Sequence, residues 1–161
     1  MLRLLLSSSI FILFFAGCGS SGNPAISEAG SAEEKEVKKA IKAFTDFYSE
    51  KETQSLDELF TEEPQAIVIG IGNDMWKGKQ SIKKKMEKAM DDVEDSHIAV
   101  RDQVIRVAGH LAWFSQRGDW SYDYKGQRVN LEGVRLTGVL LYDEGKWKIT
   151  QWHTSYPVRA Q

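Results

Sequence analysis

Polar and titratable side chains alternate with apolar ones along the last two strands that the sequence predicts. In the final strand, at about residues 146–155, a period of two places five residues on one face: Trp147, Ile149, Gln151, His153 and Ser155. In the strand before it, Arg135, Thr137, Val139 and Leu141 share a face. A buried arginine and a histidine in an otherwise apolar cleft would bind a carboxylate or another polar group of a ligand.

General acid–base catalysis needs a titratable pair within hydrogen-bond reach of the substrate. His153 is the one histidine placed to serve, and Asp46 and Asp74 are its possible partners. A structural interpretation stands beside this one. His153 and Ser155 would then hydrogen-bond to neighbouring backbone and lock the sheet against the first helix, and the two aspartates would be ordinary surface residues.

Other kinds of catalytic centre find no support in the sequence. His97, His110 and His153 lack the spacing to carboxylates that a metal site requires. No serine lies in a nucleophile elbow, and the segment 70–72 (Gly-Ile-Gly) is not followed by the helix-opening pattern of a dinucleotide loop. We therefore expect no metal and no cofactor.

The N-terminal residues have the order of a secretory signal. Arg3 is followed by an apolar run from Leu4 to Phe15 and then by small residues before Cys18. A membrane-spanning helix needs about 20 apolar residues, and this run is shorter. Cys18 is the only cysteine of the chain, and an unpaired thiol on an exported protein is expected to be modified.

The segment Phe15-Ala16-Gly17-Cys18 resembles the lipobox of bacterial lipoproteins, with Phe15 where leucine is usual. The resemblance implies that residues 1–17 are a signal peptide and that acyl chains such as palmitate are attached at Cys18. Two or three chains would anchor the protein stably to a membrane, facing the periplasm or the cell exterior. The alternative is an ordinary cleaved signal with an incidental cysteine.

Composition divides the remaining chain into a tether and one domain. Residues 18–31 are rich in Gly, Ser and Ala, which predicts a flexible tether, so order is expected to begin near Ala32. Residues 32–161 have the length of one ordinary domain. The net charge of -2 argues against nucleic acid as a partner.

Periodicity predicts helices first and strands afterwards. A long amphipathic helix starts at Glu33, a second opens at the capping-box pattern 55–58 (Ser-Leu-Asp-Glu), and a third covers about 79–92. Strands are expected at 66–71 and at about 96–108, 111–122, 127–142 and 146–155. This order indicates an α+β fold in which helices pack on one face of a curved antiparallel sheet.

Residues 33–157 resemble the nuclear transport factor 2-like (NTF2-like) superfamily, and within it the SnoaL-like group. The shared features are the long first helix, the short helix Leu-Asp-Glu-Leu-Phe, the Trp-x-Gly-x-x-x-Ile segment that starts at Trp76, the strand 135–139 (Arg-Leu-Thr-Gly-Val), and the final strand 147–155. The resemblance implies a cone-shaped, cystatin-like roll in which the sheet curls round the first helix and leaves a pocket at its open end. Relatives include enzymes and pure binding modules, so the fold alone does not give the function.

The resemblance also implies which side chains enter the pocket. Thr137 and His153 match inward positions of the family, so we expect Arg135 to point inward as well. The predicted ligand-binding residues are Tyr48, Trp76, Trp113, Arg135, Thr137, Gln151 and Ser155, with His153 as the catalytic candidate. The aromatic members have a second interpretation as core residues.

We expect a tethered binding or interaction module in preference to an enzyme. Its pocket would hold a small, partly apolar ligand. Apolar residues on the other sheet face predict a homodimer: Leu136, Leu140, Tyr142, Trp152 and Tyr156. The alternative is an isomerase, dehydratase or hydrolase that uses His153. A ketosteroid isomerase mechanism is not expected, because its tyrosine aligns with Phe44 and its aspartate with the apolar stretch 68–70.

Overall fold

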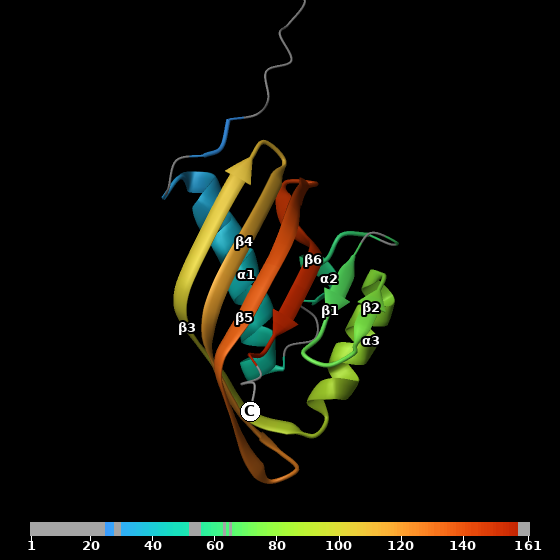
Figure 1. Cartoon of the computed structure of the whole chain (residues 1–161). Coiled ribbons are helices and arrows are strands. Elements are labelled where there is room, and N and C mark those ends of the chain that lie inside the picture. The colour runs from blue at the N-terminus through green and yellow to red at the C-terminus, as the bar shows by residue number, and fades with distance from the viewer. Residues whose placement is uncertain (1–24, 28–29, 52–55, 63, 65, 158–161) are drawn as a thin grey trace, which may run out of the picture.

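The computed structural model describes residues 25–27, 30–51, 56–62, 64 and 66–157, which form an α+β domain (Figure 1). Its helices are α1 (Ala32–Glu50), α2 (Leu56–Leu59) and α3 (Lys79–Met90). Its strands are β1 (Ile67–Ile69), β2 (Met75–Lys77), β3 (Val93–Ala108), β4 (Leu111–Tyr124), β5 (Gln127–Asp143) and β6 (Lys146–Ser155). Every predicted helix and strand is present, and β2 is an addition to the prediction.

The N-terminal part of the described chain lies along the end of β3. Ile26 forms an antiparallel bridge with Ala108, and the Ser27 amide donates to the Val107 carbonyl at 2.7 Å. The end of the predicted tether therefore contacts the domain, ahead of the expected start of order near Ala32. The predicted signal peptide, Cys18, the tether up to residue 24 and the cap residue Ser55 lie outside the described residues. Among the helices that the structure describes, none is long and apolar enough to cross a membrane.

The helix α1 follows its sequence pattern closely. At its start, the Ser31 hydroxyl accepts a hydrogen bond from the Glu34 amide at 3.2 Å, which satisfies one of the free amides of the first turn. At its end, Lys51 adopts a left-handed conformation and its amide donates to Phe47. The buried side is lined by Val37, Ile41, Phe44, Thr45 and Phe47. This spacing turns one side of α1 toward the sheet.

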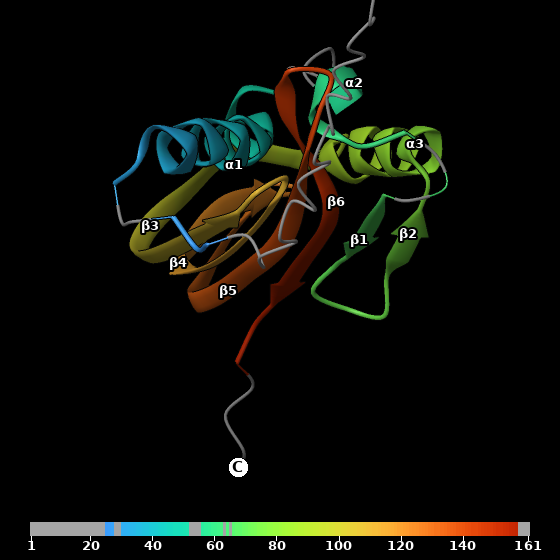
Figure 2. The same ribbon diagram turned by 90° about the horizontal axis from the view of Figure 1, so that it is seen from above.

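The six strands form one curved sheet in the order β2-β1-β6-β5-β4-β3. From β3 to β6 the chain is an antiparallel meander, as expected. The pairing of β1 with β6 is parallel, so the curved, mainly antiparallel sheet is mixed at this pair. The helices α1 and α3 lie side by side on the same side of the sheet (Figure 2).

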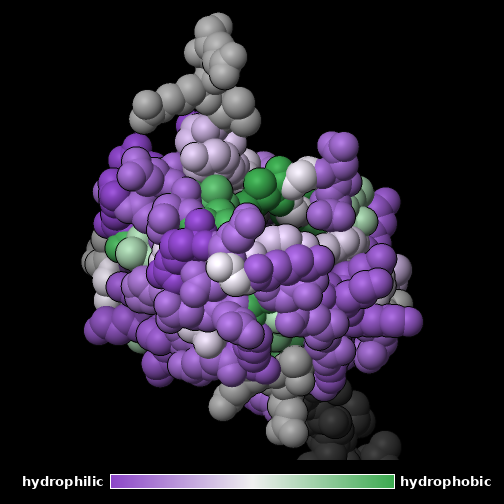
Figure 3. All heavy atoms as spheres, turned by 90° about the horizontal axis from the view of Figure 1, so that it is seen from below, coloured by the Kyte–Doolittle hydropathy of each residue, from purple (hydrophilic) through white to green (hydrophobic). Residues whose placement is uncertain are grey.

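The core lies between α1 and the inner face of the meander. Trp152 is fully buried, and its ring centroid lies 4.1 Å from that of Phe44 and 5.0 Å from that of Phe114. Phe44 also meets Phe60 edge to face at 5.5 Å. The aromatic residues thus concentrate inside, and the surface seen from below is largely hydrophilic with small hydrophobic areas (Figure 3).

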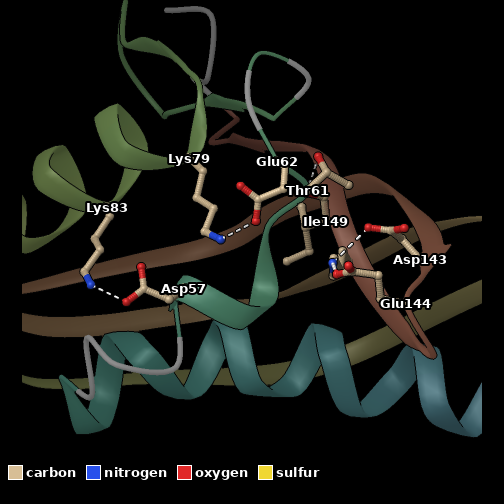
Figure 4. Close-up of polar contacts among 9 residues, drawn as sticks. Asp57, Thr61, Glu62, Lys79, Lys83, Asp143, Glu144 and Ile149 are labelled. Atoms are coloured by element: carbon tan, nitrogen blue, oxygen red, sulfur yellow. Dashed lines mark hydrogen bonds and ion pairs between the residues drawn. The ribbon is translucent and has the colours of Figure 1, made fainter.

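The helix α3 is held beside the sheet through α2 and the residues that follow it (Figure 4). Lys83 Nζ pairs with Asp57 Oδ2 at 2.5 Å, and Lys79 Nζ pairs with Glu62 Oε1 at 2.7 Å. Next to Glu62, the Thr61 amide donates to the Ile149 carbonyl of β6 at 3.0 Å. These contacts, together with buried Ile82 and Met86 on its inner side, place α3 opposite the ends of β4 and β5.

A bulge bends β4 and β5 close to their shared hairpin. Gly118 pairs with Val134 and Trp120 pairs with Leu131, so the register shifts between these pairs. The Asp119 carboxylate accepts a hydrogen bond from the Gly133 amide at 2.9 Å. A Cβ atom at Gly118 would collide with the carbonyl oxygen of Ala99 in β3, so only glycine allows this close approach.

A second bulge lies in β6. Leu140 pairs with Ile149 but Val139 pairs with Gln151, which leaves Thr150 as one extra residue on β6. Ile149 and Trp152 are therefore both on the inner face, although an unbroken period of two would place them on opposite faces. Beyond the bulge, the inner residues of β6 are Trp152 and Thr154.

Candidate functional site

A cavity of about 380 Å³ opens between α3, the end of α1, the β1–β2 turn and the bent ends of β4 and β5. The cavity lies at the end of the domain that carries the β4–β5 hairpin. The β3–β4 turn, next to which Ile26 pairs, lies at the opposite end of β4 (Figure 1). The volume of the cavity falls in the range of small-molecule sites.

Three aromatic rings in contact form one wall of the cavity. The ring centroids of Tyr48 and Trp120 lie 5.0 Å apart with the planes at 70°, and those of Trp120 and Tyr122 lie 4.9 Å apart at 45°. The Trp120 indole Nε1 donates to the Ser96 hydroxyl of β3 at 3.0 Å. Because Tyr48 also meets Phe44 edge to face at 5.7 Å, the wall is continuous with the core and its rings have little freedom to move.

Aliphatic side chains and one buried hydroxyl complete the inner surface. Met86 and Met90 of α3 and Val68 of β1 line it and are each at least nine-tenths buried. Thr154 of β6 lines it as well, and its hydroxyl accepts a hydrogen bond from the Trp152 indole at 3.0 Å. The hydroxyl proton of Thr154 is then available to donate to a ligand.

Two of the tyrosines that line the cavity are neutral at physiological pH. Burial raises the pKa of the Tyr48 hydroxyl well above its ordinary value. Burial raises the pKa of Tyr122 as well, and the neighbouring Tyr124 adds to the shift. Both hydroxyls therefore serve as neutral hydrogen-bond donors or acceptors and not as bases.

Asp74 stands at the rim of the cavity, in the turn that connects β1 to β2. The Gly70 amide donates to the Asp74 carbonyl at 3.0 Å and closes this turn. A Cβ atom at Gly70 would lie only 3.2 Å from the Cβ of Asp74, so the absence of a side chain at Gly70 leaves room for Asp74. Its side chain is exposed on the solvent side and lines the mouth of the cavity.

The structure brings part of the predicted site together. Tyr48 and Trp76, two of the residues expected in the pocket, line the cavity, and Asp74, one of the two possible partners of His153, lines its mouth. Asp46, the other predicted partner of His153, lies in a separate groove between α1 and β3 and pairs with Lys42 at 2.5 Å.

The predicted inward orientation of the other site residues was wrong. Arg135, Thr137, Gln151, His153, Ser155 and Trp113 lie on the outer face of the sheet, and the register pairs Thr137 with His153 and Val139 with Gln151 there. For the residues of β6 the Thr150 bulge is the physical reason, because it reverses the face of every later residue of that strand relative to Trp147 and Ile149. Arg135 and Thr137 of β5 pair with Ser155 and His153 and share their face, and Trp113 of β4 pairs with Val139 on the same face. The inner face carries Val134, Leu136, Leu140, Trp152 and Thr154 instead.

The sequence prediction missed most of the residues that form the cavity wall. Trp120, Tyr122 and Tyr124 recur at every second position of β4, which is the pattern of one strand face. Met86 and Met90 lie within the predicted third helix but were not predicted as part of a site. The alternating aromatics were the signal that could have identified the wall.

The cavity and its surroundings contain few groups for catalysis. His153 is separated from it by the sheet, since its neighbour Thr154 is the residue of β6 that lines the cavity. In the part of the chain that the structure describes, no group of three or more histidine, cysteine, aspartate or glutamate residues could hold a metal ion.

The comparison with known families agrees with this fold. Residues 37–159 match the SnoaL-like domain. The chain belongs to this family. It thereby belongs to the NTF2-like superfamily, as the sequence resemblance predicted. A search of curated proteins found no match.

Several solved structures share the architecture of this SnoaL-like protein. An NTF2-like protein from Streptomyces avermitilis, described as a suspected dehydratase, has a TM-score of 0.72 at 17% identity and covers 79% of this chain and 97% of its own. An NTF2-like superfamily protein from Salmonella enterica has a TM-score of 0.71 at 16% identity, covering 80% and 93%. A protein with a cystatin-like fold from Caulobacter vibrioides has a TM-score of 0.64 at 16% identity, covering 77% and 89%. At this identity the likeness shows the common fold.

Proposed function

We propose that this SnoaL-like protein is a lipid-anchored binding protein that holds a small, partly apolar ligand in the cavity between α3 and the bent ends of β4 and β5. The observation that carries the proposal is the lining of the cavity. Aromatic and aliphatic side chains surround about 380 Å³, and a few polar groups, among them Asp74 and the Thr154 hydroxyl, are placed to orient a ligand. The surroundings of His153 do not favour the enzymatic alternative.

Uptake of an uncharged lipophilic fluorophore, N-phenyl-1-naphthylamine, tests the cavity. The titration uses residues 19–161, which include every residue that the structure describes. We expect saturable binding with increased fluorescence. An Ala89→Trp substitution, which fills the mouth of the cavity from α3, should weaken binding by about tenfold or more.

Lys88→Trp is the matched control, since Lys88 is an exposed neighbour on α3 outside the cavity lining. It should bind the fluorophore as the unchanged chain does. Absence of saturable binding to the unchanged chain, or equal binding by the Ala89→Trp variant, would contradict the proposal.

The position of the cavity is consistent with an anchor at Cys18. The described chain starts beside the β3–β4 turn, and the cavity opens near the β4–β5 hairpin at the other end of β4. A domain attached through its N-terminus would therefore turn the open cavity away from the membrane, toward ligands in the periplasm or outside the cell.

Labelling of cells with an alkynyl palmitate analogue tests the anchor: the protein should be labelled and fractionate with membranes, and Cys18→Ala should lose both properties. A labelled Cys18→Ala protein would disprove attachment at this residue.

We also propose that the outer sheet face pairs with a second copy of this chain. Of the five residues that were expected to drive a dimer, Leu136, Leu140 and Trp152 are buried inside the domain, so the argument was wrong for these three, while Tyr142 and Tyr156 are exposed. The outer face has apolar residues of its own: Val104, Leu111 and Trp113 are 51%, 41% and 38% exposed, and Trp113 lies beside Val139 in the register. Light scattering after size exclusion should give a dimer that Trp113→Glu dissociates and Lys88→Glu does not. A monomer at micromolar concentration would remove the proposal.

A further inference from the structure

The charge on the cavity lining has one sign. Among the described residues that line it, Asp74 is the single charged side chain, and lysine, arginine and histidine are absent from that set. Lys125, which follows the lining residue Tyr124, pairs with Asp92 at 3.2 Å and stands outside the lining. A ligand that enters the cavity therefore meets one carboxylate and no basic side chain of the lining. Anionic ligands are disfavoured by this arrangement.

The aromatic side chains supply further negative potential. Five of them line the cavity from three elements: Tyr48 of α1, Trp76 of β2, and Trp120, Tyr122 and Tyr124 of β4. Since the planes of Tyr48, Trp120 and Tyr122 are turned by 70° and 45° from one to the next, the rings form a curved wall and not a flat stack. The face of an aromatic ring attracts a cation through its quadrupole, and tryptophan does so most strongly.

The rim of the cavity already holds a cation against one of these rings. Lys125 Nζ lies 5.3 Å from the centroid of Tyr124, within the range of a cation–π contact. Tyr124 is 44% exposed, so the contact forms at the solvent side of the wall. The deeper rings Tyr48 and Trp120 have no comparable basic side chain in the described structure.

We propose that the ligand of this cavity is an organic cation, a small molecule whose tertiary or quaternary ammonium group lies against the aromatic wall and near Asp74. The proposal rests on the proposed function, because it assumes that the cavity binds a small ligand. Met86, Met90 and Val68 provide an apolar surface for the rest of the molecule. A quaternary ammonium group suits such a wall, since its methyl groups carry the charge and need no hydrogen-bond acceptors.

Three probes of similar shape separate charge from hydrophobic binding: phenyltrimethylammonium, the uncharged tert-butylbenzene and the anionic benzenesulfonate. Each is titrated against residues 19–161 that hold N-phenyl-1-naphthylamine, and its displacement of this fluorophore gives an affinity. We expect the cation to bind about tenfold more tightly than the uncharged probe, as aromatic rings and one carboxylate together allow. Benzenesulfonate should bind most weakly.

The variant Asp74→Asn removes the charge and keeps the shape. It should lower the affinity for phenyltrimethylammonium toward that for tert-butylbenzene, with the contribution of the aromatic rings remaining, and leave the uncharged probe unaffected. Asp102→Asn is the matched control, because it changes the net charge equally. Asp102 lies on the outer face of β3, where it pairs with Arg117. Trp76→Leu, at the half-buried position on β2, tests the aromatic contribution. It should weaken binding of phenyltrimethylammonium more than binding of the uncharged probe.

The outcomes distinguish this inference from the proposed function. The fluorophore and tert-butylbenzene could bind while phenyltrimethylammonium binds no more tightly than tert-butylbenzene, or Asp74→Asn could keep the full preference for the cation. Either result overturns the proposal of an organic cation and leaves the binding function standing. If no probe and no fluorophore binds, both proposals fail. A preference for the cation that falls in Asp74→Asn and persists in full in Asp102→Asn supports the inference.

Discussion

Within β6, the indole Nε1 of Trp152 donates a hydrogen bond of 3.0 Å to the hydroxyl of Thr154, two residues further along the inner face. Both side chains are buried, and Trp152 is the largest fully buried residue of the core. The indole has one polar atom to satisfy, and Thr154 accepts its proton at the inner surface of the cavity. Core packing and the candidate site thus depend on the same residue pair.

Replacing Thr154 by valine should destabilise the protein, because valine has nearly the same shape but leaves the buried indole N–H without an acceptor. We expect the free energy of unfolding to fall by about 1–3 kcal/mol. Urea unfolding measures it. Thr154→Ser, which keeps the hydroxyl, should lose less. Ser155→Ala on the outer face is the control and should change stability by no more than about 0.5 kcal/mol. An equal loss in Thr154→Ser and Thr154→Val would contradict the role of the hydrogen bond.

Gly118→Ala should disturb the bend that brings β4 over the cavity. The added Cβ would collide with the Ala99 carbonyl of β3, and backbone on both sides must shift to make room. The expected loss is about 1–3 kcal/mol, with weaker uptake of the uncharged fluorophore because Trp120 moves. Gly72→Ala is the control for stability: nothing lies within 4 Å of a Cβ there. Unchanged stability and uptake in Gly118→Ala would show that the strands can separate freely at this point.

Gln116→Met should stabilise the protein. The Nε2 atom of Gln116 is buried on the inner face of β4 without a hydrogen-bond partner in the described structure, while its Oε1 accepts from Gln103 at 2.7 Å. Methionine fills a similar volume without a polar atom, so the free energy of unfolding should rise by about 1 kcal/mol in thermal or urea unfolding. Replacing the other member of the pair, Gln103→Met, leaves both polar atoms of the Gln116 side chain without a partner and should lower the free energy of unfolding. The same sign of change in both variants would disprove this account.

The ion pair between Glu58 of α2 and Lys146 of β6 should make the free energy of unfolding depend on pH in the acidic range. A hydrogen bond of 2.6 Å from Lys146 lowers the pKa of Glu58 below its ordinary value. Because the folded-state pKa is the lower one, the stabilisation is present above the ordinary pKa of glutamate and is lost as the pH falls through the folded-state value. A carboxyl titration by NMR should place Glu58 below its ordinary pKa, and Lys146→Met should raise it. Lys39→Met on α1 should leave Glu58 unchanged; no change in Lys146→Met would contradict the assignment.

The helices and the long strands could be predicted from the sequence because they depend on local patterns. The apolar spacing of α1 and α3 and the turns at residues 109–110, 125–126 and 144–145 mark their limits within a few residues. The three-residue strand β2 was missed, since Met75–Lys77 shows no period of its own and pairs only through β1. Pairing of β1 with β6 in parallel joins residues some 80 positions apart, which no local pattern records.

The site was predicted only in part, and for β6 the reason lies in one residue. The period of two correctly predicts that Trp147 and Ile149 point inward. Thr150 is an extra residue in the strand, and it turns the later residues His153 and Ser155 outward. A bulge of this kind is decided by pairing with β5 and by packing of Trp152 on Phe44 and Phe114, not by the residues of β6 alone.

The order of helices and strands follows from local periodicity, and the motifs along the chain indicate the family, whose resemblance in turn suggested Tyr48 and Trp76 as pocket residues. Which sheet face is inside and which residues enclose the cavity depend on contacts between distant segments. Two bulges, at Thr150 in β6 and in β5 opposite Asp119, set the phase of β6 and accompany the bend of β4 and β5, and both are consequences of contacts between strands. The aromatic wall of Tyr48, Trp120 and Tyr122 exists because that bend brings β4 against the end of α1.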